Sequence, residues 1–228
     1  MTKLKLTATL FLGLLMANPA FASIGVDKMV LEMDTAANTR QNVFVSNNGD
    51  KTAYVATDVF EIKNPGDENE ERVPVNLKDK NRLIVAPNKL VIEPQDKKRI
   101  QFNTTDTNLE KDKIYRISVA PKISGIETDE GVNIKILIGY DILAIVRPAK
   151  PVFDLKVDKK GGHITFKNNG NTNVLLASVK QCPQKDKCEM LLSRRLYAGN
   201  KAEIKLIDIT KPVIAEIHYG DEIKTETY

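Results

Sequence analysis

The sequence lacks the short motifs by which common enzyme active sites are recognised, and it has little histidine. It contains no Gly-x-Ser-x-Gly turn, no His-Glu-x-x-His motif, no phosphate-binding loop and no Gly-x-Gly-x-x-Gly motif. Only two histidines are present, His163 and His218, and both fall in segments typical of surface or half-buried strands. The sequence therefore predicts a protein that is not an enzyme and that uses no metal and no cofactor.

Long hydrophobic runs and an excess of one charge are also missing. Beyond residue 22, no segment offers the roughly 20 uninterrupted apolar residues that a membrane-spanning helix needs, so we expect no membrane insertion. The 34 basic residues nearly balance the 30 acidic ones, for a formal net charge of +4. A balance this close to neutral argues against a nucleic-acid-binding protein.

The N-terminal segment MTKLKLTATLFLGLLMANPAFA has the form of a secretory signal peptide. Lys3 and Lys5 supply the positive region, Leu6–Ala17 is a short apolar core, and Ala20–Ala22 matches a small-x-small cleavage pattern. We expect cleavage after Ala22. The remaining chain then carries a net charge of +2, because both lysines are lost.

Cysteine is scarce, and the two present lie close together, in QCPQKDKC. In an oxidising compartment, such a pair predicts a disulfide between Cys182 and Cys188. A zinc site is the alternative, but it needs about four ligands, and only His163 and His218 are available to complete it. The disulfide would close a small loop and stabilise the fold by about 2–3 kcal/mol.

Helical periodicity is almost absent, and short alternating runs take its place. Examples are KTAYVATDVFEI, NRLIVAP and KIYRISVAP, separated by clusters of Asn, Gly, Asp and Pro. Turn signals at roughly 8–12-residue intervals are typical of an all-β protein built from β-sandwiches.

A faint internal echo predicts two domains. FVSNNG at 44–49 returns as TFKNNG at 165–170, 121 residues later, and each copy precedes a second strand-like run. A coincidence of two Asn-Asn-Gly turns is the alternative. The prolines of RPAKP at 147–151 mark a boundary. We therefore expect domains at 23–147 and 152–228, joined by a linker at 148–151.

The most informative segment is VNIKILIGYDILAIV at 132–146, in which every even-numbered position is apolar. This period of two predicts a β-strand, although fifteen residues far exceed the usual length of about 5–6. A long apolar strand in a secreted all-β protein favours β-augmentation, in which one chain adds a strand to the sheet edge of another.

Taken together, these segments resemble the periplasmic chaperones of bacterial pilus assembly. These form the PapD-like superfamily of the chaperone–usher pathway, and the similarity is greatest to its divergent alternative branch, which serves class 5-type fimbriae. The resemblance is carried, in order, by NPGDENEERVPV, LIVAPNKLVIEPQDKKRIQF, KIYRISVAP, the long strand ending in IVRP, then NNGN and the paired cysteines.

The resemblance implies two immunoglobulin-like β-sandwich domains in an L, with an inter-domain cleft, and a location in the periplasm. It implies fimbrial (pilin) subunits and an outer-membrane usher as partners, with self-association possible in the free protein. It also implies donor-strand complementation, in which the long strand of the first domain completes a subunit that lacks one strand.

In the family that the chain resembles, the donor residues lie some nine to thirteen positions before the arginine that ends the strand, which here points to Ile134, Ile136 and Ile138. Val132 would extend the same face, so these four residues are expected to be the donors. Their alternative role is to fill the core of the first domain itself. For Tyr140, Ile142 and Ala144, nearer the boundary, the core role is expected.

In the family, basic residues in the cleft hold the carboxylate at the end of the subunit. The better-known branch places two cations at positions that here are Val30 and Leu143, so those anchors are missing. The resemblance instead points to Arg147 and Arg116, with Lys135 as a weaker candidate. The alternative for Arg147 is an internal ion pair that ties the two domains together.

Two other functions stay open. The chain can be read as a two-domain fimbrial structural subunit or adhesin, or as a secreted enzyme with an unrecognised site. A subunit would carry an N-terminal donor extension and an apolar closing strand, whereas the C-terminal residues here, KTETY, are polar.

Overall fold

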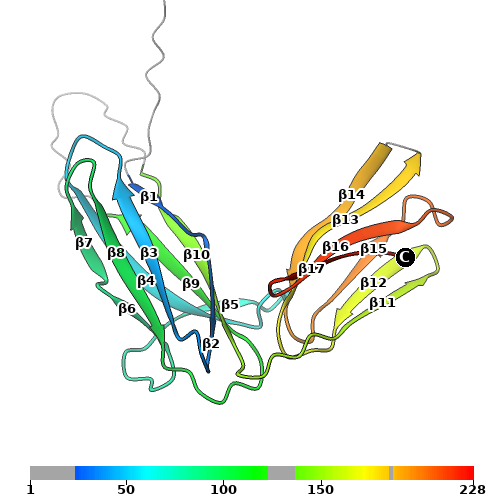
Figure 1. The fold of residues 1–228 in the computed structure, drawn as a ribbon, viewed down its shortest axis with the longest axis horizontal. Helices are drawn as coiled ribbons and strands as arrows, with labels where there is room; N and C mark the ends of the chain where they lie inside the picture. The colour runs from blue at the N-terminus through cyan, green and yellow to red at the C-terminus, as the bar shows by residue number, and fades with distance from the viewer. Residues whose placement is uncertain (1–23, 123–136, 185–186) are drawn as a thin grey trace, which may run out of the picture.

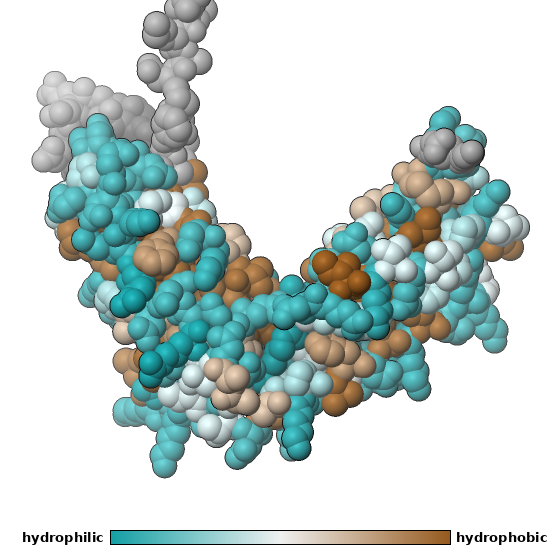
Figure 2. Space-filling model, viewed as in Figure 1, coloured by the Kyte–Doolittle hydropathy of each residue, from teal (hydrophilic) through white to brown (hydrophobic). Residues whose placement is uncertain are grey.

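The computed structural model describes residues 24–122, 137–184 and 187–228, and the regular elements in these ranges are all β-strands. The strands build two domains that lie like the two arms of an L (Figure 1). The space-filling view shows an open cleft between the arms (Figure 2). The expected all-β, two-domain architecture is therefore confirmed.

Within the described ranges, no helix has the length and apolar character needed to cross a membrane.

The first domain is a sandwich of two sheets. One has the strand order β1-β3-β8-β6 and the other the order β2-β10-β9-β4-β5, with β7 also paired to β4. The strands of the first sheet are β1 (Ile24–Val26), β3 (Arg40–Asn47), β6 (Leu83–Ala86) and β8 (Lys97–Thr104). Those of the second, called here the β10 sheet, are β2 (Val30–Asp34), β4 (Ala53–Lys63), β5 (Glu71–Pro74), β7 (Lys89–Ile92), β9 (Lys113–Pro121) and β10 (Tyr140–Arg147).

Alternation along the strands builds the core between these two sheets. On β10, Ile142, Ala144 and Val146 are fully buried in it, as the period of two predicts. Leu143 and Ile145 point to the opposite face and join a separate cluster. We call this second face of the β10 sheet its cleft face, because residues of the second domain pack against it.

The predicted fifteen-residue strand is shorter in the structure. Of the described residues, Leu137–Gly139 lie outside any strand, and β10 begins only at Tyr140, opposite Val119 of β9. The pairing of β10 with β9 ends at Tyr140 and Val119, although β9 itself continues to Pro121 in its pairing with β4. The apolar alternation of one strand does not show how far the neighbouring strand stays hydrogen-bonded to it.

The second domain is a smaller sandwich, with sheets in the orders β11-β12-β15 and β14-β13-β16-β17. Its strands are β11 (Leu155–Lys160), β12 (His163–Asn168), β13 (Val174–Gln184), β14 (Lys187–Leu196), β15 (Lys201–Lys205), β16 (Val213–Tyr219) and β17 (Glu222–Thr227). The last residue, Tyr228, exchanges two backbone hydrogen bonds with Val213. The final strand is thus paired along its length.

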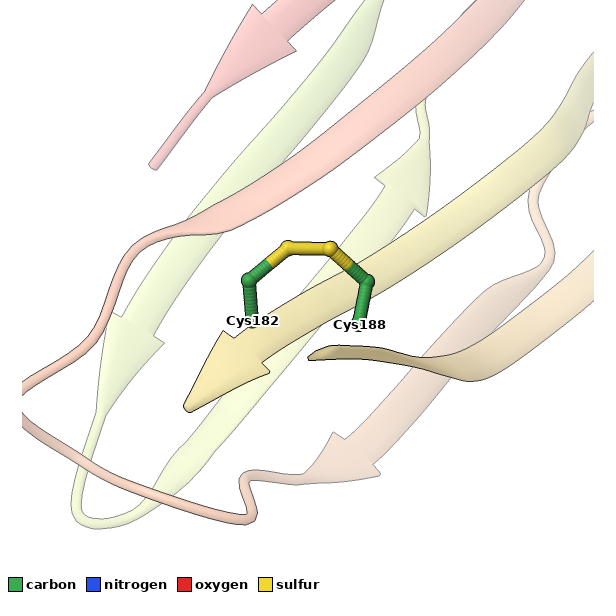
Figure 3. The surroundings of a disulfide bond; sticks show 2 residues. All are labelled: Cys182 and Cys188. Atoms are coloured by element: carbon green, nitrogen blue, oxygen red, sulfur yellow. A yellow bond between two sulfur atoms is a disulfide. The ribbon is translucent and has the colours of Figure 1, made fainter. Parts of the chain in front are cut away.

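The predicted disulfide is confirmed. It joins Cys182 near the end of β13 to Cys188 at the start of β14 (Figure 3), with an S–S distance of 2.00 Å. Neither histidine contacts it: His163 lies beside the carbonyl of Gly161, and His218 beside Glu216. The bond therefore closes the hairpin of a small domain that has limited core of its own.

We predict that replacing both cysteines by serine lowers the free energy of unfolding by about 2 kcal/mol, because the crosslink restricts the unfolded chain over a short loop. Urea denaturation of the double variant and of the wild type measures the difference. Adding a reductant should bring the wild type down to the variant, and should leave the variant unchanged. Equal stability of all samples would contradict this account.

Candidate functional site

The upper part of β10 has an open edge. On one side, β9 pairs with it from Tyr140 to Val146, but on the other side β2 runs parallel to it only from Leu143 to Arg147. The chain before β2 belongs to β1, which pairs with β3 in the other sheet. Among the described strands, none therefore pairs with Tyr140–Ile142 on that side, which leaves backbone groups free for an added strand.

One of the four predicted donor residues is described. Ile138 is 46% exposed and lies immediately before this open edge. Val132, Ile134 and Ile136 lie outside the described residues. Within the edge, Tyr140 packs its side chain against the core, and its hydroxyl donates to the carbonyl of Ile24 at 2.9 Å. Tyr140, Ile142 and Ala144 have the core role expected of them.

The two positions that lack the anchor cations are neighbours in space. Val30 pairs in register with Leu143, and Leu143 with Arg116 on the next strand. Residues paired in register project to the same face, so all three side chains form one row across the cleft face. Arg116 is the cation of this row, and its side chain is 37% exposed.

Arg116 belongs to a group of charges that includes two residues sequence reasoning missed. Its Nε lies 3.8 Å from Asp141 Oδ2, and Arg72 Nη2 donates to Asp141 Oδ1 at 2.7 Å. The Arg72 guanidinium also lies 4.3 Å above the centre of the Phe60 ring. Two arginines therefore share one carboxylate on the cleft face. Lys135, the third predicted cation, lies outside the described residues.

Arg147, at the end of β10, joins the two domains. It is 8% exposed, and its Nη2 donates to Glu32 of β2 at 2.9 Å. Its Nη1 donates to the hydroxyl of Thr172, and its guanidinium lies 5.8 Å from the centre of the Phe153 ring. Thr172 and Phe153 belong to the second domain, so Arg147 contacts both domains, whereas its ion pair with Glu32 lies within the first domain.

A second buried polar contact lies close to Arg147. Asp112 Oδ2 accepts hydrogen bonds from both the backbone and the side-chain nitrogen of Asn173, the former at 2.7 Å. Asp112 Oδ1 is buried and has no hydrogen-bond partner among the described atoms. Burial raises the pKa of this carboxyl, and the hydrogen bonds from Asn173 and Thr172 and the charge of Arg147 only partly oppose the rise.

An apolar contact also joins the two domains. Tyr197 of the second domain packs on the cleft face against a cluster of four side chains: Ile62, Ile114, Leu143 and Ile145. Asn200 donates to the carbonyl of Pro65 at 2.8 Å. Beside it, Gly66 has a φ of +73°, and an added Cβ would lie 2.8 Å from Asn200 Nδ2. The close approach of the domains here therefore depends on glycine.

The comparison with protein families matches more than half of the chain. The model of the CS5 fimbrial protein N-terminal domain matches residues 26–147, which hold β2 to β10 and the whole cleft face. The chain belongs to the CS5 fimbrial protein family. No curated protein sequence matches it.

Solved structures share the fold of this CS5-family protein. The class 5 fimbriae chaperone CfaA is 19% identical, with a TM-score of 0.65 over 90% of this chain and 98% of its own. The SafB chaperone, solved with the SafA pilin of Salmonella enterica, is 14% identical, with a TM-score of 0.63 over 91% and 96%. The structure of the CsuC–CsuE chaperone–tip subunit complex of Acinetobacter baumannii is also similar. Its matching chain is 15% identical, with a TM-score of 0.61 over 90% of this chain and 98% of its own.

For this CS5-family protein, we predict that Asp112→Asn changes how stability depends on pH. The folded-state pKa of Asp112 lies above its ordinary value of 3.8. The folded protein therefore holds this proton more tightly, and the free energy of unfolding falls as pH rises through the window that begins at 3.8.

The variant lacks this titration, so its stability relative to the wild type should increase as pH rises above about 4. Urea denaturation at several pH values measures the trend. Asp158→Asn, on the exposed side of β11, is the matched control and should run parallel to the wild type. A parallel profile for Asp112→Asn as well would show that the buried carboxyl does not titrate in this window.

Proposed function

We propose that this protein is a periplasmic chaperone that binds fimbrial subunits by donor-strand complementation and delivers them to an outer-membrane usher. The observation that carries the proposal is the open edge of β10 beside the exposed Ile138, on the wall of an open cleft. The apolar alternation of residues 132–138 continues this edge in the sequence. Backbone hydrogen bonds at the edge supply affinity, and alternate side chains fill the pockets of the partner.

Membership of the CS5 fimbrial family supports the fimbrial setting, and two of the similar folds were solved together with a subunit. The N-terminal signal pattern supports export. The absence of a nucleotide-binding motif in the sequence fits a holder that works without ATP or catalysis. Val132, Ile134, Ile136 and Ile138 are proposed as the donor residues.

Arg116 is proposed as the principal anchor for the carboxylate at the end of the subunit. It is partly exposed, faces the cleft and stands in the row with Val30 and Leu143. A guanidinium holds a carboxylate through two parallel hydrogen bonds. Arg147 is proposed to act mainly by holding the two domains, because its donors already reach Glu32 and Thr172. Lys135 stays a secondary candidate.

The alternative, a two-domain fimbrial subunit or adhesin, fits one observation poorly. A subunit that receives a donor strand leaves its own sheet incomplete. Here β17 pairs with β16 from Ile214 to Tyr219, and Tyr228 closes the ladder onto Val213. The second domain is complete without a partner.

We predict that Ile138→Asp abolishes capture of a fimbrial subunit co-expressed from the neighbouring operon genes, while the chaperone itself stays folded. The exposed side chain contributes little to the free protein, but its burial in a complex is worth about 1.5–3 kcal/mol, or roughly 10- to 150-fold in affinity. Co-purification measures the captured subunit. Asn133→Asp is the control, because Asn133 is one of the odd-numbered positions that alternate with the proposed donor residues. This variant should capture the subunit normally.

The outcomes of this experiment separate the candidate functions. Loss of capture with Ile138→Asp, and likewise with Ile136→Asp, fits strand donation. Normal capture by both variants would mean that the run serves only the chain itself. A wild-type protein that captures no subunit would move the fimbrial-subunit alternative ahead.

A further inference from the structure

Three charged groups meet on the cleft face, and their geometry is that of a filled carboxylate site. Asp141 accepts from Arg72 at 2.7 Å and lies 3.8 Å from Arg116. The three residues come from β5, β9 and β10, and Arg72 and Asp141 are 69 residues apart in the sequence. With two cations and one anion, the cluster has a net charge of +1 and can accept a second carboxylate.

The ring of Phe60 orients the Arg72 guanidinium for contact with a carboxylate. Its guanidinium lies over Phe60, and Phe60 pairs in register with Arg116. Stacking on a ring fixes the plane of the guanidinium and lowers the entropy lost when it binds an anion. The two arginines therefore lie on strands that flank β4, and the side chains of both reach the carboxylate of Asp141.

Asp141 is bound weakly enough to be replaced. The side chains of Arg72, Arg116 and Asp141 are 40%, 37% and 45% exposed, so water screens their ion pairs. A subunit that covers this face would remove that water and strengthen each contact between an arginine and its terminal carboxylate. Asp141 would then be a like charge beside the new anion and would turn away from it.

We propose that Arg72 is the second arm of the carboxylate anchor, and that Asp141 occupies the anchor in the free protein until a terminal carboxylate replaces it. The inference rests on the proposed function, since a strand-donating chaperone supplies the partner that carries the carboxylate. Asp141 thereby makes the site selective: a partner without a terminal carboxylate gains nothing by displacing it.

The test uses one defined peptide in two forms, acetyl-Thr-Val-Thr-Ile-Thr-Tyr as the free acid and as the amide. Each is titrated into ¹⁵N-labelled protein, and the side-chain Nε–H signals of Arg72 and Arg116 are followed by NMR. We expect both signals to shift with the acid only. Arg72→Ala and Arg116→Ala should each weaken binding of the acid by about 10-fold or more, with little effect on the amide.

Asp141→Asn should tighten binding of the acid several-fold, because it removes the internal competitor. Asp58→Asn is the matched control: Asp58 is an exposed carboxylate that shares this face through its pairing with Ser118, and no ion pair joins it among the described residues. The control should change acid binding much less than Asp141→Asn. Circular dichroism confirms that each variant is folded.

The proposal is overturned if Arg72→Ala keeps the full difference between acid and amide, or if Asp141→Asn gains no more than Asp58→Asn. Failure of the proposed function looks different, because the wild type would then capture no subunit at all. A chaperone that captures subunits equally well with and without Arg72 keeps its function and loses only this anchor.

Discussion

The parallel pairing of β2 with β10 begins only at Leu143, and much of the molecule is arranged around that starting point. Below it, β10 is hydrogen-bonded on both sides and buried on both faces, by the first-domain core and by the second domain. Above it, the strand has one partner, and the exposed Ile138 lies just before its first residue. A strand that is fixed at one end and open at the other can receive a new neighbour without loss of its own core.

The position of the second domain depends on polar groups that are costly to bury. Arg147 and Asp112 lie close to the junction, and each finds its partners across it, in Thr172 and Asn173. Burying a charge costs several kcal/mol unless it is paired and hydrogen-bonded, so separating the domains would leave these groups unpaired or force them to rehydrate. The apolar contact of Tyr197 adds burial to the same junction. The cleft angle is therefore set by contacts with strict geometry.

Much of this arrangement could be predicted from the sequence, because it follows from local patterns. Alternation placed Ile142 and Ala144 in the core, and the spacing of Cys182 and Cys188 allowed only a short crosslink. The start of β10 could not be predicted, because it depends on where pairing with β9 ends, at Val119, and alternation within one strand does not report this. Arg147 could be placed at the domain boundary, but its choice between a subunit and Thr172 depends on a contact across the junction.

Arg72 and Asp141 were hidden from sequence reasoning for a related reason. Arg72 lies in a polar stretch and Asp141 in the apolar run 132–146, and only the order β2-β10-β9-β4-β5 brings them onto one face. A chaperone without a nucleotide needs to hold a subunit firmly and still release it, so a cation site that is always open would be a poor solution. An internal carboxylate avoids this difficulty: when a subunit leaves, Asp141 returns to the arginines and offsets part of the lost electrostatic energy. The contact that a subunit has to replace, between Asp141 and the two arginines, is therefore already present on the surface of the free protein.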